Sequence, residues 1–139
     1  MSAVAYTAAQ IAPVFADECE IRTFIAAETI TQGQPLYCNS SGDAALADAN
    51  GSGTKQFIGL ALNGGGAGQA IDVLRRGECY GFTLTSLAYG ALVYVSDSVG
   101  TYQDSTGTVA IPVGRVQPLS DTSRTKVLLI NTNINADWA

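Results

Sequence analysis

The stretch 70–84, AIDVLRRGECYGFTL, constrains the fold most, because apolar and polar residues alternate along it with a period of two. Ile71 and Val73 mark the alternation before a polar, glycine-containing break at 75–78, and Tyr80 resumes it afterwards. A helix would scatter these side chains around its circumference, whereas a strand places them on one face. Two such runs around a short polar break predict a β-hairpin with 75–78 at its tip.

Composition agrees with a β fold of one domain. The chain has 139 residues, of which 47% are hydrophobic and 14% charged, so it can bury a core of its own. Its fifteen glycines follow no collagen-like period and are typical of a protein with many tight turns. We therefore expect an all-β protein.

The second half of the chain repeats the strand and turn spacing of the first. Gly33 and Gly90 lie 57 positions apart (90 − 33), and Gly59 and Gly114 lie 55 apart (114 − 59). Two further pairs carry the repeat: Tyr37/Tyr94 and Leu74/Leu129. Identities are few, and regular strand–turn spacing gives such a pattern by chance as well. A true repeat predicts a small β-barrel or sandwich built from two similar strand–turn–strand units.

The chain divides into an N-terminal arm with an acidic lead-in (1–20), a β domain (21–130) and a C-terminal tail (131–139). Residues 1–12 are small and weakly patterned, so we expect an extended arm outside the core that orders only on a partner. Its apolar side chains would gain from burial there. They are Val4, Tyr6 and Ile11.

Three further residues complete the candidate protein interface. Arg75 and Arg76, at the expected hairpin tip, either form a solvated turn or anchor an interface, where Arg is enriched. Trp138 in the tail packs either on its own domain or on a partner.

Reactive chemistry is scarce. The chain has no histidine, which removes the usual base of nucleophilic catalysis and the commonest metal ligand. Cys19, Cys38 and Cys79 form no CxxC pair, so we expect reduced, buried thiols. We expect no enzyme, no cofactor and no metal site.

Charge and hydropathy exclude other partners. The net charge of −5 argues against nucleic acid, whose phosphates require a basic face. No run of 18 apolar residues is present, so we expect no membrane span. The first fifteen residues lack the basic and continuous apolar regions of a signal peptide, which predicts a cytosolic product.

Six strand-and-turn motifs carry a resemblance to a known family. They are ETITQGQPLY (28–37), FIGLALNGGGAGQ (57–69), VLRRGECYGF (73–82), LAYGALVYVSD (87–97), PVGRV (112–116) and SDTSRTKVLLI (120–130). Together they resemble the capsid cement, or head decoration, proteins of tailed phages. The resemblance implies a structural virion protein, made in the host cytoplasm, that binds the exterior of an icosahedral head. It also implies a homotrimer that stabilises contacts between subunits of the major capsid protein.

A second class of function remains open. A carbohydrate- or receptor-binding β module of a phage fibre or baseplate would use exposed aromatic rings as a stacking platform. Five tyrosines are candidates for that platform: Tyr37, Tyr80, Tyr89, Tyr94 and Tyr102. Their period-two placement favours core or interface packing instead.

Overall fold

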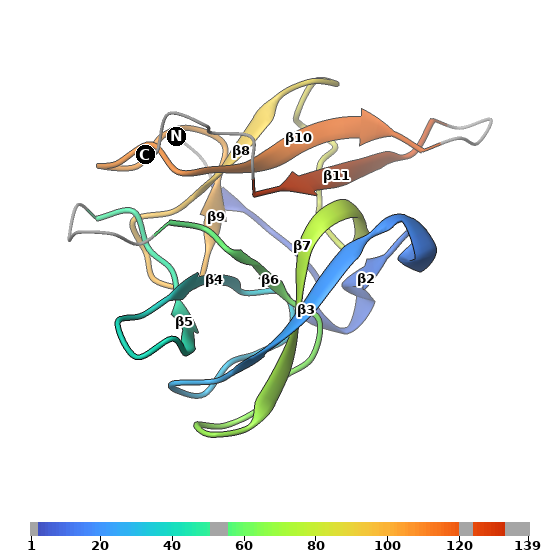
Figure 1. The fold of residues 1–139 in the computed structure, drawn as a ribbon. Helices are drawn as coiled ribbons and strands as arrows, with labels where there is room; N and C mark the ends of the chain where they lie inside the picture. The colour runs from blue at the N-terminus through green and yellow to red at the C-terminus, as the bar shows by residue number, and fades with distance from the viewer. Residues whose placement is uncertain (1–2, 51–55, 120–123, 133–139) are drawn as a thin grey trace.

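The computed structural model describes residues 3–50, 56–119 and 124–132, and within these ranges the protein is all-β, as predicted (Figure 1). It contains eleven strands, two single-turn 3₁₀ helices and no α-helix in that part of the chain. The strands are β1 (Ala3–Val4), β2 (Ala12–Pro13), β3 (Glu20–Ile25), β4 (Pro35–Cys38), β5 (Ala44–Leu46), β6 (Gly59–Ala61), β7 (Ala70–Tyr80), β8 (Leu92–Val95), β9 (Tyr102–Gln103), β10 (Pro112–Pro118) and β11 (Lys126–Asn131). The 3₁₀ helices are η1 (Ala8–Gln10) and η2 (Ala16–Glu18).

The strands pair antiparallel in the order β1-β9-β8-β10-β11-β7-β6-β4-β5, and β2 and β3 also pair with β7. The sheet folds into two layers and does not close into a barrel. Figure 1 shows β8, β10 and β11 above, and β3, β4, β5 and β6 below. Backbone hydrogen bonds still join the two ends of the sheet, because Ala49 N donates to Ser96 O and Gly100 N donates to Ala47 O, both at 2.9 Å.

The predicted hairpin is wrong: β7 runs unbroken from Ala70 to Tyr80. The polar break is a kink rather than a turn. On β3, Glu20 pairs with Arg76 while Ile21 pairs with Leu74, so Arg75 is the extra residue of a β-bulge. Such a bulge bends a strand, and Gly77 beside it has a φ of +134°, which a glycine adopts without strain.

The kink in β7 carries the strand from one layer to the other. Before it, β6 pairs with β7 through Leu60 and Leu74, and after it, β11 pairs with β7 through Leu129 and Glu78. One long strand therefore serves both layers.

The two repeated units are confirmed by their strand registers. In the first unit Leu60 lies opposite Leu74, and in the second Arg115 lies opposite Leu129, each 55 positions on (115 − 60, 129 − 74). The next ladder repeats as well: Leu36 lies opposite Gly59, as Val93 does opposite Gly114.

The repeat also explains the length of β7. Its N-terminal half is the last strand of the first unit, and its C-terminal half takes the place that β3 holds in that unit. Ile21 lies opposite Leu74, and Glu78, 57 positions after Ile21 (78 − 21), lies opposite Leu129. The tandem units thus share β7, and the RRG sequence marks their junction.

Both units contribute to one main core. Its largest fully buried side chains include Leu60 and Leu74 from the first unit and Tyr102 and Leu128 from the second. A smaller cluster around Leu36 and Ile71 lies within the first unit. The shared core implies that neither unit buries its apolar face alone.

The arm predicted for residues 1–12 is wrong for the described part, 3–12, because these residues belong to the fold. Val4 and Ile11 are only 7% and 3% exposed and lie in the main core. β1 pairs with β9, and β2 pairs with the C-terminal half of β7. The segment therefore covers two strands of the second unit and is ordered without a partner.

An aromatic cluster fixes the N-terminal segment to both units. Tyr6, Phe82 and Tyr102 have ring centroids 5.0–5.7 Å apart, two of the three contacts being edge-to-face. The hydroxyl of Tyr102, which is fully buried, donates to Gly33 O at 2.7 Å.

In the described part of the chain no helix is long and apolar enough to cross a membrane.

Candidate interaction surfaces

Arg75 and Arg76 lie in the middle of β7, not at a tip, and both pair with Glu20. The distance from Arg76 Nη2 to Glu20 Oε1 is 3.2 Å, and from Arg75 Nη1 to Glu20 Oε2 it is 3.6 Å. The Arg75 side chain is 27% exposed and that of Arg76 is 50% exposed. The pairs connect β7 to β3 at the bulge, and an interface role for either arginine stays a prediction.

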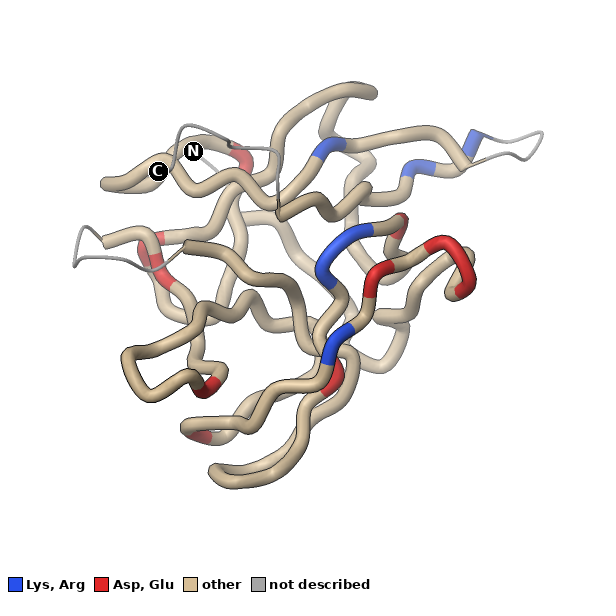
Figure 2. The backbone as a smooth tube through the Cα atoms, in the orientation of Figure 1, with Lys and Arg blue, Asp and Glu red and all other residues tan. Residues whose placement is uncertain are grey.

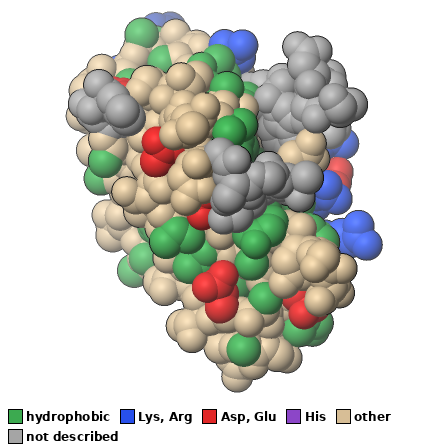
Figure 3. Space-filling view, turned by 90° about the vertical axis from the view of Figure 1, so that its left-hand side faces the viewer, with side chains coloured by type: hydrophobic (Ala, Val, Ile, Leu, Met, Phe, Trp, Pro, Cys, Tyr) green, Lys and Arg blue, Asp and Glu red, His purple; other side chains and the backbone are tan. Residues whose placement is uncertain are grey.

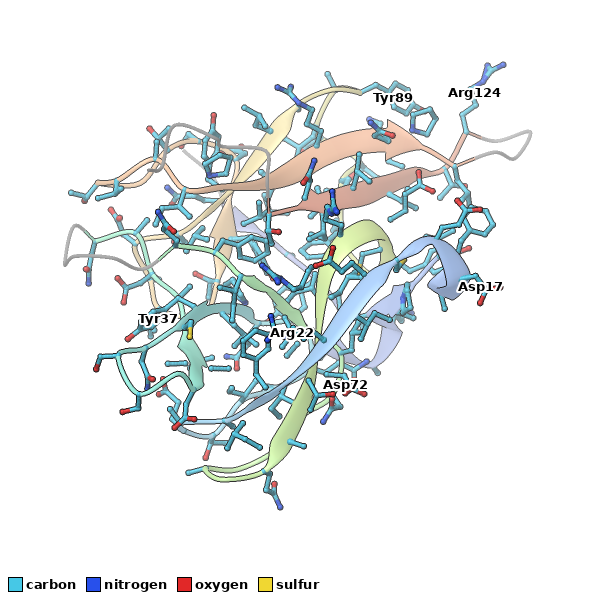
Figure 4. All side chains as sticks on the ribbon, viewed as in Figure 1. Asp17, Arg22, Tyr37, Asp72, Tyr89 and Arg124 are labelled. Carbon is cyan, nitrogen blue, oxygen red and sulfur yellow. The ribbon has the colours of Figure 1, made fainter. Side chains whose placement is uncertain are left out.

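An open pocket of about 580 Å³ lies between the η2 loop and β11. Its lining includes Asp17, Glu18, Glu20 and Arg76, and Figure 4 shows Asp17 at the edge of the molecule. Among the described residues, no three His, Cys, Asp or Glu side chains lie close enough together to hold a metal ion.

A second open pocket, of about 570 Å³, lies beside the loop between β7 and β8; we call it the Tyr89 groove. Its lining is Phe82, Thr83, Leu84, Thr85, Tyr89, Arg124, Thr125 and Lys126. The Tyr89 hydroxyl donates to Arg124 O at 2.6 Å, and Lys126 Nζ lies 5.2 Å from the centre of the Tyr89 ring. The tyrosine is still 51% exposed, so the groove presents an aromatic ring whose cationic neighbour is Lys126. Figure 4 shows Tyr89 and Arg124 at the same end of the molecule.

The lining of the Tyr89 groove holds two cationic side chains, Arg124 and Lys126, and no acidic one among the described residues. Arg115, Arg124 and Lys126 are three of the seven cationic residues, and β10 and β11 carry no acidic residue (Figure 2). Figure 3 shows the contrasting face on the side of β4 and β5, where acidic side chains lie within the view and basic ones at its margin.

The three cysteines are free, as expected for reduced thiols, but only Cys79 is buried. Cys19 is partly covered and Cys38 is exposed, which corrects the expectation that all three are core residues. Burial raises the pKa of the Cys79 thiol to about 12, so it stays protonated at neutral pH. Cys19 lies against Gly77 at the kink, and burial is the main cause that raises its pKa too.

The tyrosines do not form the stacking platform that a sugar-binding module requires. Tyr102 is completely buried in the aromatic cluster, and Tyr37 and Tyr94 are half-buried on β4 and β8. Only Tyr80 and Tyr89 are exposed. The five rings proposed from the sequence as one stacking surface therefore do not lie together on the surface of the protein.

The edge of β3 is a surface that the sequence did not single out. Five of its six residues are exposed, and Ile21 and Ile25 are 41% and 46% exposed. Alternation along 20–25 is weak, so the pattern gave no sign of which side would remain open. Trp138, a candidate interface residue, lies outside the described residues.

Comparison with known protein families, with characterised proteins and with solved structures found no match to this chain.

Proposed function

We propose that this chain is a decoration protein that binds the outer surface of an icosahedral tailed-phage head. Its partner is the major capsid protein, whose subunit contacts it stabilises, and its copies assemble as trimers on the head. It acts by adding binding surface rather than by catalysis.

The observation that carries this proposal is where the family-like motifs lie. They fall on the duplicated scaffold of turns and strands rather than on one loop. Gly33 N donates to Ala61 O and Gly90 N donates to Val116 O, both at 2.7 Å, so the motif turns share one construction. The motifs that carry the resemblance therefore belong to the framework of the molecule, which supports a structural role.

The Tyr89 groove is the contact that we propose for the head. Arg115 Nη1 donates to Gly90 O at 3.0 Å, and Lys126 Nζ donates to Leu87 O, so both cations hold the loop beside the groove. A loop held in this way loses little conformational freedom on binding. The exposed ring and the cations suit an acidic or amphipathic patch, and Tyr and Arg are common interface anchors.

Co-sedimentation tests the proposal. Empty heads assembled from the major capsid protein of the same phage should bind the chain saturably at a fixed ratio, and should dissociate at a higher temperature when bound. Tyr89→Ala combined with Arg124→Glu should weaken binding by about tenfold or more, as for interface anchors.

A matched control changes exposed apolar side chains elsewhere. Val99 and Val109 are 55% and 40% exposed, and Val99 follows β8 at the end away from Tyr89. Val99→Ser with Val109→Ser should bind like the natural chain. No binding by the natural chain refutes the proposed function, whereas binding that ignores Tyr89 and Arg124 refutes only the groove as the contact.

A further inference from the structure

The Tyr89 groove lies where two paired strands separate. Residues 82–85 line one wall of the groove and residues 124–126 line the other. In the described part of the chain, no backbone hydrogen bond joins these two segments. The ladder between β7 and β11 ends at Cys79, opposite Leu128, just before the groove begins.

The first unit shows the equivalent strands without a groove. There β3 and the N-terminal half of β7 stay paired as far as Ala26, whose N–H donates to Gln69 O at 2.9 Å. Cys79 is equivalent to Arg22 (79 − 57), so the ladder of the second unit ends four residues earlier (26 − 22). The groove is therefore a place where the repeat leaves a ladder incomplete.

Other partners take the bonds that would continue this ladder. The residues equivalent to the last bonded pair of the first unit are Thr83 and Arg124 (83 − 26 = 57, 124 − 69 = 55). Thr83 N donates to Ala5 O at 2.9 Å, and Arg124 O accepts from the Tyr89 hydroxyl (Figure 4). One wall of the groove thus pairs with the N-terminal segment, and the other is bonded to Tyr89.

The remaining backbone groups point into the groove. In a trans peptide unit the C=O and the N–H of the next residue point in opposite directions. Gly81 O and Thr83 N both bond to the N-terminal segment, so the N–H and C=O of Phe82 point away from it. Thr125 O accepts a hydrogen bond from the β10 side, so the N–H of Lys126 points away from β10. Phe82 and Lys126 therefore offer backbone groups from opposite walls, as two strand edges do.

The charges of the lining favour one kind of occupant. Backbone bonds hold an extended segment of any sequence, and side chains beside them select which segment binds. Arg124 and Lys126 are cationic, and no described acidic side chain lines the groove. A segment with carboxylate side chains is therefore complementary to it.

We propose that the Tyr89 groove takes up an extended, carboxylate-bearing segment of the major capsid protein as an additional strand between its two walls. Because β7 and β11 are antiparallel, this strand is antiparallel to one wall and parallel to the other. Phe82 and Lys126 bond to its backbone, and Arg124 attracts its carboxylates. The inference rests on the proposed function and specifies how that contact is made.

Hydrogen exchange of backbone amides tests strand insertion. The chain, free or bound to empty heads of the major capsid protein, is exchanged in D2O, dissolved in acidified dimethyl sulfoxide and read by NMR. The amides of Phe82 and Lys126 should exchange about tenfold or more slowly on the head than in the free chain. The amide of Thr83, already bonded to Ala5 O, is the control and should remain slow in both states.

A charge reversal tests the acidic character of the segment. Arg124→Glu should weaken head binding by about tenfold, measured by co-sedimentation. Arg22→Glu makes the same change in net charge at an exposed position of β3. It is the matched control and should bind like the natural chain.

Failure of this contact and failure of the proposed function give different results. A natural chain that does not bind heads refutes both. Binding that leaves the amides of Phe82 and Lys126 as fast as in the free chain overturns strand insertion alone. Equal effects of Arg124→Glu and Arg22→Glu overturn the acidic segment. If these amides slow without heads as the chain concentration rises, the occupant is a second copy of this chain and the proposal is wrong.

Discussion

Two glycines, Gly59 and Gly114, occupy the same position in the two units for the same physical reason. A Cβ on Gly59 would collide with the carbonyl oxygen of Leu74, and one on Gly114 would collide with that of Leu129. Only glycine permits this approach between neighbouring strands. Gly59/Gly114 and Leu74/Leu129 are two of the pairs that revealed the repeat in the sequence. The repeat was therefore visible because each unit needs the same close contact between a glycine and a neighbouring backbone.

Replacing either of these glycines by alanine should destabilise the protein. Overpacking costs about 1–3 kcal/mol, and Gly59, with a φ of +142°, adds backbone strain. Gly59→Ala should therefore lower the free energy of unfolding more than Gly114→Ala, as measured by urea denaturation. Gly66→Ala is the control, because the nearest atom to its added Cβ is a side-chain oxygen 3.9 Å away; an equal loss there would contradict this reading.

Cys79 gives the stability a dependence on pH. Its pKa rises from the ordinary value of 9.0 to about 12 in the folded chain. The unfolded chain loses this proton first, so the stability contributed by the protonated thiol is fully present below pH 9 and is lost between pH 9 and 12. At pH 10 the loss relative to neutral pH should be about 1.4 kcal/mol.

A variant isolates that contribution from other groups that titrate at high pH. Cys79→Ala should be less stable than the natural chain at pH 7, and the difference should shrink by pH 10. Urea denaturation at both values measures it. A difference that does not change with pH would mean that the thiol is equally easy to ionise in both states.

At the scale of elements, β7 shows the limit of a local pattern. Alternation correctly predicted a strand on each side of 75–78. A turn and a bulge both use polar residues and glycine, so those residues do not decide whether the chain reverses or only bends. The choice is made by β3 and β11, which pair across the kink from distant parts of the sequence.

The N-terminal segment shows a second limit. Its small residues indicate that it cannot build a core by itself, and this part of the prediction holds: the segment forms no core of its own. It adds Val4, Tyr6 and Ile11 to a core formed by other elements, and no local pattern reports that the second unit leaves two strands uncovered.

Deleting residues 1–14 should therefore destabilise or unfold the protein. Burial of each large apolar side chain contributes roughly 1.5–3 kcal/mol, and most of a typical stability of 5–15 kcal/mol would be lost with several of them. Thermal denaturation followed by circular dichroism measures this. Phe15→Ser, which changes a side chain that is 48% exposed, is the control. A truncated chain with an unchanged melting temperature would show that the segment does not stabilise the fold and is a free arm.

At the scale of the whole molecule, the two units share β7 and one core. We expect the fragments 20–75 and 76–132 to be unfolded separately, and the full chain to unfold in a single transition. Circular dichroism of the fragments, alone and mixed, tests this. An isolated fragment with a cooperative transition of its own would show that the units are independent domains.

The all-β class and the repeat could be predicted because both depend on periodicities that the sequence displays directly. The candidate surfaces could not, because exposure is decided by long-range packing. Arg75 and Arg76 were expected at an exposed tip but lie in mid-strand and pair with Glu20, although the Arg76 side chain is still 50% exposed. The exposed side chains of β3 became visible only when the neighbouring strands were placed.

We proposed above that this chain decorates the outside of a phage head. Electron cryomicroscopy of heads assembled with and without the chain tests it most directly. We expect additional density at symmetry-related positions on the exterior, into which the two-layered fold fits with the Tyr89 groove toward the head. A head whose exterior is bare, with the protein found instead at the tail or fibres, would contradict it.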